Sequence, residues 1–315
     1  MKLGVAFTWH LHPWETLLSL VQRAEELGYA AAFVDGDVSM LDSNSRRDVL
    51  DGWTVTTALL AQTRRIEIGS IRVVHYWNAA HLAQSVATIE RMAPGRLRFF
   101  ISIGDRPNDE RFGLRRLPAS ERIRWLGESL TALRHLWSGE SVTLAGRYVQ
   151  LSDARVRPRP ASGGIPITIA ARSPRMLEQV AVHADWWDVN LPAVGARVRR
   201  AAEQLDKACH QRGRDPGEIR RSQWLFTRPD PHPGATQALR EFRSWNPWFG
   251  GIPDAEIRPA LVLGDAAHCR ERLAELAGEL SLDLPVIDLS GLAAGPAGAA
   301  LEALAPANTD VDAGT

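Results

Sequence analysis

The chain has 315 residues, of which 45% are hydrophobic and 23% are charged, so it carries enough apolar side chains for a large buried core. Its 37 basic residues balance 37 acidic ones, which excludes the overall positive field that attracts nucleic acid or an anionic membrane. No stretch reaches the roughly 18 uninterrupted apolar residues of a membrane span, and the N-terminal apolar run is too short for a secretory signal. We therefore expect a cytoplasmic protein with no nucleic-acid and no membrane partner.

The only two cysteines, Cys209 and Cys269, lie in stretches rich in arginine and glutamate. Neither belongs to a CxxC pair or has histidines at metal-ligand spacing. We interpret both as reduced residues of helices, and we expect no metal site.

The first strand and helix show the pattern that the rest of the chain repeats. Residues 3–7 form a short apolar run, which predicts a buried strand. Pro13 suits the first position of a helix, and Gly28 suits its end. Between them, apolar residues recur at the spacing of one helix face: Trp14, Leu17, Leu18, Val21, Ala24 and Leu27.

The same alternation of short strands and amphipathic helices continues along the chain. Further strands are predicted near residues 30–34, 66–74, 97–103, 165–170, 185–191, 222–227 and 284–289. Helices are predicted between them near residues 53–62, 81–92, 120–137, 174–183, 194–212, 234–243 and 266–280. Eight alternating units favour a closed (β/α)8 TIM barrel, an α/β fold, over an open doubly wound sheet.

Two segments exceed a minimal barrel. Residues 141–160 predict a β-hairpin inserted before the fifth strand, and residues 228–259 predict a long insertion after the seventh strand. We assign residues 1–295 to one barrel domain and residues 296–315 to a C-terminal helix and a partly disordered tail.

The second insertion carries Trp245, Trp248 and Phe249. Active sites of such barrels lie at the C-terminal ends of the strands, so this insertion is placed to act as an aromatic lid. A contact between subunits is the alternative interpretation.

Several blocks of the chain resemble one family in the same order. They are RAEELGYAAAFV, ALLAQTRRIEIGS, HLAQSVATIERMAPGRLRFFISIG, LRHLWSGESVTLAGRYVQL and PITIAARSPRMLEQVAVHADWW. Together they resemble the luciferase-like monooxygenase superfamily strongly over residues 1–192, and the resemblance returns weakly at LVLGDAAHCRERLAEL. This resemblance implies a barrel that binds either FMN or the deazaflavin coenzyme F420.

The start of the predicted helix at residue 174 is the expected phosphate site. Ala170, Ala171, Arg172 and Ser173 end the fifth strand and precede Pro174. The first turn of a helix has free N–H groups and the positive end of the dipole, which together favour an anion. Ser173 followed by Pro174 would also suit any helix start, but Arg172 favours a phosphate.

Asp105 is the main catalytic candidate. It follows Gly104 after the fourth strand, where deazaflavin-dependent members of the superfamily carry a Gly-Glu pair, and some carry an asparagine where Asn108 stands. A carboxylate beside a redox ring can exchange the proton that accompanies hydride transfer. The alternative is a structural carboxylate that caps the loop or pairs with Arg106.

The resemblance also implies that the cofactor ring rests on Gly69, Ser70 and Ile71 of the third strand. Family members often carry a non-proline cis peptide there, which the alignment places between Gly69 and Arg72.

The loop after the second strand departs from the deazaflavin pattern, because Asp35 is not followed by the customary histidine. His10 after the first strand and His75 after the third strand can reach the same barrel mouth and are candidate acid–base groups. Each is otherwise a solvated or capping loop residue. Trp9, beside His10, is expected to shape the substrate site.

We predict an F420-dependent oxidoreductase that transfers a hydride to or from a small substrate. The tryptophans of the insertion suit an apolar or polycyclic substrate. The alternative is an FMN-dependent monooxygenase that relies on a separate flavin reductase. Luciferase's phosphate-binding arginine aligns with Ile103, and Arg106 can take its place. A non-catalytic flavin-binding barrel is a third hypothesis, and we expect a homodimer.

Overall fold

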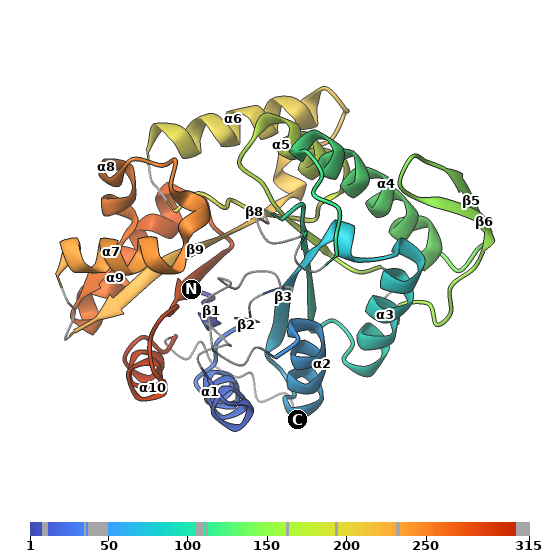
Figure 1. The fold of residues 1–315 in the computed structure, drawn as a ribbon. Helices are drawn as coiled ribbons and strands as arrows, with labels where there is room; N and C mark the ends of the chain where they lie inside the picture. Colours follow the sequence, from blue (N-terminus) through green and yellow to red (C-terminus); the bar gives the residue numbers. More distant parts are fainter. Residues whose placement is uncertain are drawn as a thin grey trace.

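A computed structural model shows a closed barrel of eight parallel strands with helices around it (Figure 1). It describes residues 1–7, 12–34, 36, 50–104, 110, 113–161, 164–192, 195–230 and 234–306, apart from the side chain of Trp248. Each barrel strand pairs with its neighbours in chain order, and β8 pairs with β9 to close the sheet. The barrel strands are β1 (Gly4–Phe7), β2 (Ala31–Val34), β3 (Glu67–Val73), β4 (Leu97–Ser102), β7 (Ile167–Ala170), β8 (Trp186–Asp188), β9 (Arg220–Pro229) and β11 (Leu284–Asp288).

The predicted barrel and its eight strands are confirmed. The main helices are α1 (Trp14–Glu26), α2 (Gly52–Gln62), α3 (Ala79–Met92), α4 (Ala119–Trp137), α5 (Pro174–His183), α6 (Ala196–His210), α7 (Ala235–Trp245), α9 (Ala266–Glu279) and α10 (Ala294–Ala303). Within α1, the predicted apolar stripe buries Leu17, Val21 and Ala24. No helix in the described ranges is long and apolar enough to cross a membrane.

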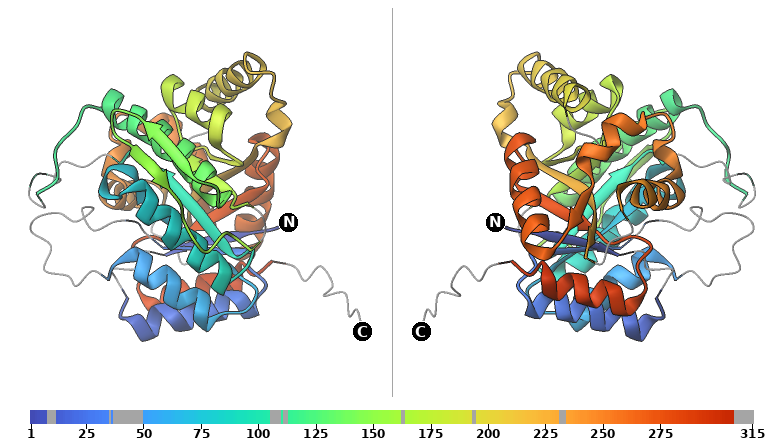
Figure 2. Two further views of the ribbon diagram at one scale, coloured as in Figure 1. Left: turned by 90° about the vertical axis from the view of Figure 1, so that its right-hand side faces the viewer. Right: turned by 90° about the vertical axis from the view of Figure 1, so that its left-hand side faces the viewer.

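The last helix completes the ring by packing beside the first one (Figure 1, Figure 2). Tyr29, just after α1, donates a hydrogen bond to the Leu301 carbonyl over 3.1 Å. Arg23 of α1 pairs with Glu302 of α10 at 2.5 Å. These contacts join the two ends of the described chain.

Both predicted insertions are present. β5 (Val142–Ala145) and β6 (Gln150–Ala154) form an antiparallel hairpin before β7. After β9 come α7, a 3-10 helix at Pro247–Phe249, α8 (Asp254–Ile257) and a second 3-10 helix at Arg258–Ala260. β10 (Val262–Gly264) was not predicted; it extends the sheet beyond the barrel by pairing with the end of β9.

Alternate residues of the barrel strands point inward, as the pleat requires. The interior cluster includes Ala6, Phe33, Phe100, Trp186 and Val286. Toward the N-terminal ends of the strands, Arg98 lies 3.8 Å over the Trp186 ring and pairs with Glu67. This packing fills the barrel interior near the N-terminal ends of the strands.

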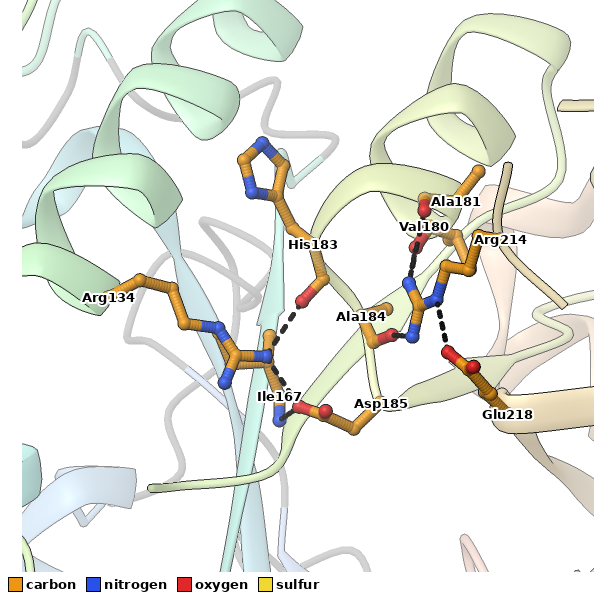
Figure 3. A network of polar contacts seen from close by, with 9 residues as sticks. All are labelled: Arg134, Ile167, Val180, Ala181, His183, Ala184, Asp185, Arg214 and Glu218. Carbon is orange, nitrogen blue, oxygen red and sulfur yellow. Dashed lines mark hydrogen bonds and ion pairs between the residues drawn. The ribbon is translucent and has the colours of Figure 1, made fainter. Parts of the chain in front are cut away.

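Two arginines hold the connection from α5 to β8 (Figure 3). Arg134 of α4 donates to the His183 carbonyl at 3.0 Å and pairs with Asp185 at 2.6 Å. From the other side, Arg214 donates to the carbonyl of Ala184 at 2.7 Å and to that of Ala181 at 3.0 Å. Cations at the C-terminal end of a helix satisfy its last carbonyls and complement its dipole. Arg134 and Arg214 therefore hold the turn that leads from α5 into β8 in place.

The imidazole of His183 should make stability depend on pH. Its burial, reinforced by the positive charges of Arg134 and Arg214, lowers its pKa from 6.5 to about 4. The unfolded chain therefore binds a proton first as the pH falls, and stability should decrease from about pH 6.5 to about pH 4. The contribution has an upper limit of about 3 kcal/mol, at about 1.4 kcal/mol for each pH unit. Urea unfolding of wild type and His183→Gln across this range measures it, and the variant should lose less stability. Equal losses would contradict this assignment.

Candidate active site

A cavity of about 370 Å³ opens at the C-terminal ends of the strands, beneath α7 and the 3-10 helix that follows it. Ile71, Phe100, Ile103, Met176 and Leu191 give it apolar walls. The other lining residues that matter below are Gly104, Arg122, Ala170, Arg172, Ser173, Asp188, Gln223, Trp224, Phe242, Asn246, Phe249 and Asp288. This is the end of a (β/α)8 barrel where ligands bind.

The expected phosphate site lies on the rim of this cavity. Ser173 is the N-cap of α5, but its side chain makes no capping hydrogen bond, and Pro174 follows it at the first helical position. The Arg172 guanidinium lies 5.1 Å from the Phe249 ring, so it faces the segment that covers the cavity. An uncapped helix start beside an arginine suits an anionic group of a ligand.

Arg122 of α4 shapes the end of β4. Its guanidinium donates to the carbonyls of Leu117 at 3.1 Å, Ile103 at 2.7 Å and Gly104. Gly104 has a φ of 63°, a conformation that favours glycine. The sequence analysis missed Arg122, because an arginine within a predicted helix has no pattern that separates it from a solvated one.

Asp188 is a carboxyl group of the cavity whose pKa is strongly perturbed. It ends β8, is 5% exposed and accepts hydrogen bonds from Ser222 at 3.3 Å and from the Asn190 amide at 3.1 Å. Burial raises its pKa to about 7, and the two hydrogen bonds oppose that rise only in part. A group that titrates near neutral pH in a cavity is suited to proton transfer.

Asp288 brings a second carboxyl group to the same cavity from the end of β11. It is 3% exposed and accepts a hydrogen bond from the Ser290 amide at 2.9 Å. Burial raises its pKa, while Ser290 and the nearby Arg228 oppose the rise. Neither aspartate was predicted as a site residue. Asp288 lies near the end of the strand predicted at residues 284–289, which was an available signal, whereas Asp188 lies in the middle of the strand predicted at residues 185–191, and only the structure ends β8 there.

The three β3 residues that were predicted to support the cofactor ring, Gly69, Ser70 and Ile71, lie on two different faces of the strand. Ile71 lines the cavity, and Gly69 faces inward, where an added Cβ would come within 2.9 Å of the Phe33 ring. Ser70 points outward toward α2 and bonds to Thr56 at 2.8 Å. The cis peptide expected between Gly69 and Arg72 is absent from these described residues.

His75 lies away from the barrel mouth. It is 7% exposed in a 3-10 helix at Val74–Tyr76, and its ring lies 6.4 Å from that of Trp125. The cavity that it lines is a different one, bounded by α4 and the β5–β6 hairpin. The structure therefore does not bring His75 together with Arg172 and Asp188.

The remaining predicted residues lie outside the described part of the chain. They are Trp9, His10, Asp35, Asp105, Arg106 and Asn108. Of the expected lid, Phe249 lines the cavity, whereas the side chain of Trp248 is not described.

A family model for luciferase-like monooxygenases matches residues 1–282. The chain belongs to this family. It is 28% identical over 239 residues to F420-dependent glucose-6-phosphate dehydrogenase from Microbacterium testaceum, covering 73% of this chain and 68% of that one. It is 29% identical over 212 residues to pyrimidine monooxygenase RutA from Allorhizobium ampelinum, covering 63% of this chain and 56% of that one. A solved F420-dependent secondary alcohol dehydrogenase, in complex with an F420-acetone adduct, has a TM-score of 0.80 at 17% identity, covering 96% and 98% of the two chains.

These comparisons confirm the family resemblance and the fold. The relatives include both F420-dependent dehydrogenases and a monooxygenase. Within the luciferase-like family, fold alone does not separate these chemistries, so the side chains of the cavity must do so.

The raised pKa of Asp188 predicts a pH-dependent difference between wild type and Asp188→Asn. The folded protein keeps a proton that the unfolded chain releases near 3.8, so the stability provided by this group is lost as the pH rises through about 7. The variant should therefore gain stability relative to wild type between about pH 4 and pH 7, by at most about 4 kcal/mol. Urea unfolding at several pH values measures this difference. A difference that does not vary with pH would remove Asp188 as the titrating group.

Proposed function

We propose that this protein is an F420-dependent oxidoreductase that transfers a hydride between the deazaflavin and a small organic substrate. The observation that carries the proposal is the pairing, in one cavity, of an uncapped helix start with a buried carboxyl group that titrates near neutral pH. The F420-dependent dehydrogenase relative supports the same choice.

The residues at the start of α5 fit a cofactor phosphate. Arg172 supplies the charge, Ser173 has a hydroxyl that is not used as a cap, and the apolar wall provided by Ile71 and Met176 suits a planar ring. When bound, a deazaflavin exchanges a hydride with the substrate. The protein itself supplies the anion site, the apolar walls and a group for the accompanying proton.

We assign that proton to the carboxyl group of Asp188. Its protonated form can donate to a substrate oxygen that gains a hydride on the adjacent carbon, and its ionised form can accept the proton in the reverse direction. A pKa of about 7 makes both forms available near neutral pH. Asp105 stays a second candidate for the same role on the strength of the family resemblance.

An FMN-dependent monooxygenase is the alternative, favoured by the pyrimidine monooxygenase relative. That activity would need reduced FMN from a separate flavin reductase. Titration of the purified protein with F420 and with FMN, followed by tryptophan fluorescence, distinguishes the two functions. Saturable binding of F420 in preference to FMN supports our proposal, and the opposite preference would replace it with the monooxygenase.

Arg172→Ala should weaken F420 binding by about 10- to 100-fold, because a charge-assisted hydrogen bond to a phosphate is worth about 1.5 to 3 kcal/mol. Calorimetric titration measures the dissociation constant. Arg175→Ala is the matched control, since Arg175 is an exposed residue of the same helix that does not line the cavity. Equal affinities for Arg172→Ala and wild type would move the phosphate away from α5.

A further inference from the structure

Asn246 lies at the C-terminal end of α7, in the segment that covers the cavity. Its backbone is held on both sides, because its amide donates to Phe242 at 2.9 Å and its carbonyl accepts from Phe249 at 3.1 Å. The side chain is 7% exposed and lines the cavity, yet its Nδ2 has no hydrogen-bond partner in the described part of the chain.

A buried amide donor without a partner destabilises a folded protein, and native structures contain few of them. A side chain of this kind, held rigidly at the wall of a cavity, is explained if a ligand supplies the missing acceptor. Trp224 repeats the feature from the barrel interior, since its Nε1 is also buried and lacks a partner among the described residues. Two residues from separate elements that line one cavity thus each carry a buried donor without a described partner.

The surroundings of Asn246 are aromatic. The rings of Phe242 and Phe249 stack with centroids 6.0 Å apart, and Phe226 meets Phe242 edge-on at 5.6 Å. Such rings pack well against an apolar or planar ligand and do not compensate for the lost hydration of an ionised group.

The charges of the described lining residues also disfavour an anionic substrate. Asp188 and Asp288 line it, and of its described lining residues only Arg122 and Arg172 are cationic. Arg122 is engaged with the backbone carbonyls around β4. Arg172 is assigned to the cofactor phosphate, so no described cation of the lining is left to bind a phosphate of the substrate.

We infer that α7 and the following 3-10 helix form a subsite for an uncharged ketone or alcohol with an apolar or aromatic body, whose oxygen accepts a hydrogen bond from Asn246 Nδ2. This inference rests on the proposed function, which it deepens by naming the substrate class. It also separates this protein from the sugar-phosphate dehydrogenase that is its relative.

The first test needs no ligand. Replacement of Asn246 by leucine removes an unsatisfied donor, so Asn246→Leu should melt at the wild-type temperature or higher. Asn78→Ala is the matched control, because Asn78 caps α3 by accepting from the amides of Ala80 and His81. That control should melt about 1–3 °C lower. A comparable loss for Asn246→Leu, repeated in Asn246→Ala, would show a structural role and overturn the inference.

The second test measures binding to the F420-loaded protein by saturation-transfer NMR. The probes are cyclohexanone, acetophenone and 2-acetonaphthone as neutral ketones, and glucose 6-phosphate as the anionic competitor. At least one ketone should bind, with an affinity reduced about 10-fold or more in Asn246→Leu, and glucose 6-phosphate should not bind. Binding of glucose 6-phosphate alone, or equal ketone affinity in variant and wild type, would overturn the inference.

The two proposals fail separately. If F420 binds but the ketones do not depend on Asn246, the subsite is wrong and the cofactor assignment stands. If F420 does not bind but the ketone titration, repeated with FMN or without cofactor, depends on Asn246, the subsite stands and the proposed function is wrong.

Discussion

The pairing of β8 with β9 closes the barrel, and the arrangement of the candidate site depends on it. In that pairing Asp188 stands opposite Ser222, whose hydroxyl donates to the Asp188 carboxyl group at 3.3 Å. Since all eight strands run in the same direction, closure gathers their C-terminal ends around one mouth. Arg172, Asp188 and Asp288 therefore face one cavity although they are far apart in sequence. Arg134 and Arg214 support the closure from outside, because they hold the turn from which β8 starts.

Buried charged groups lie at both ends of the barrel, but their surroundings differ. Near the N-terminal ends of the strands, Arg98 pairs with Glu67 and stacks on Trp186, so opposite charges compensate each other. Near the C-terminal ends, the described hydrogen-bond donors to Asp188 are neutral, and burial raises its pKa to about 7. An uncompensated carboxyl group in a medium of low dielectric favours its neutral form. The second arrangement keeps a proton available inside a cavity.

The segment between β9 and β10 contributes residues to the wall of the cavity. It places Phe242, Asn246 and Phe249 over the mouth, while its continuation into β10 and α9 anchors it to the outside of the sheet. Arg243 holds its shape by donating to the Phe249 carbonyl at 2.7 Å and pairing with Asp254 at 2.6 Å. The residues of this segment that line the cavity, Phe242, Asn246 and Phe249, are two aromatic rings and a neutral amide.

The order of elements was determined by the sequence alone. Alternating apolar runs and helical periodicity predicted all eight barrel strands and both insertions, because each of these signals is local to a few turns or residues. The helix start at Ser173 and Pro174, beside Arg172, was also predictable, since a strand end followed by a helix start is a local pattern. Ser70 shows the limit, because its position on β3 was correct but the pleat turns its side chain toward α2. Only the tertiary structure decided the roles of Asp188, Asp288, Arg122 and Asn246. Their burial, pKa shifts and missing partners arise from neighbours on other elements, and those contacts do not exist until the barrel closes.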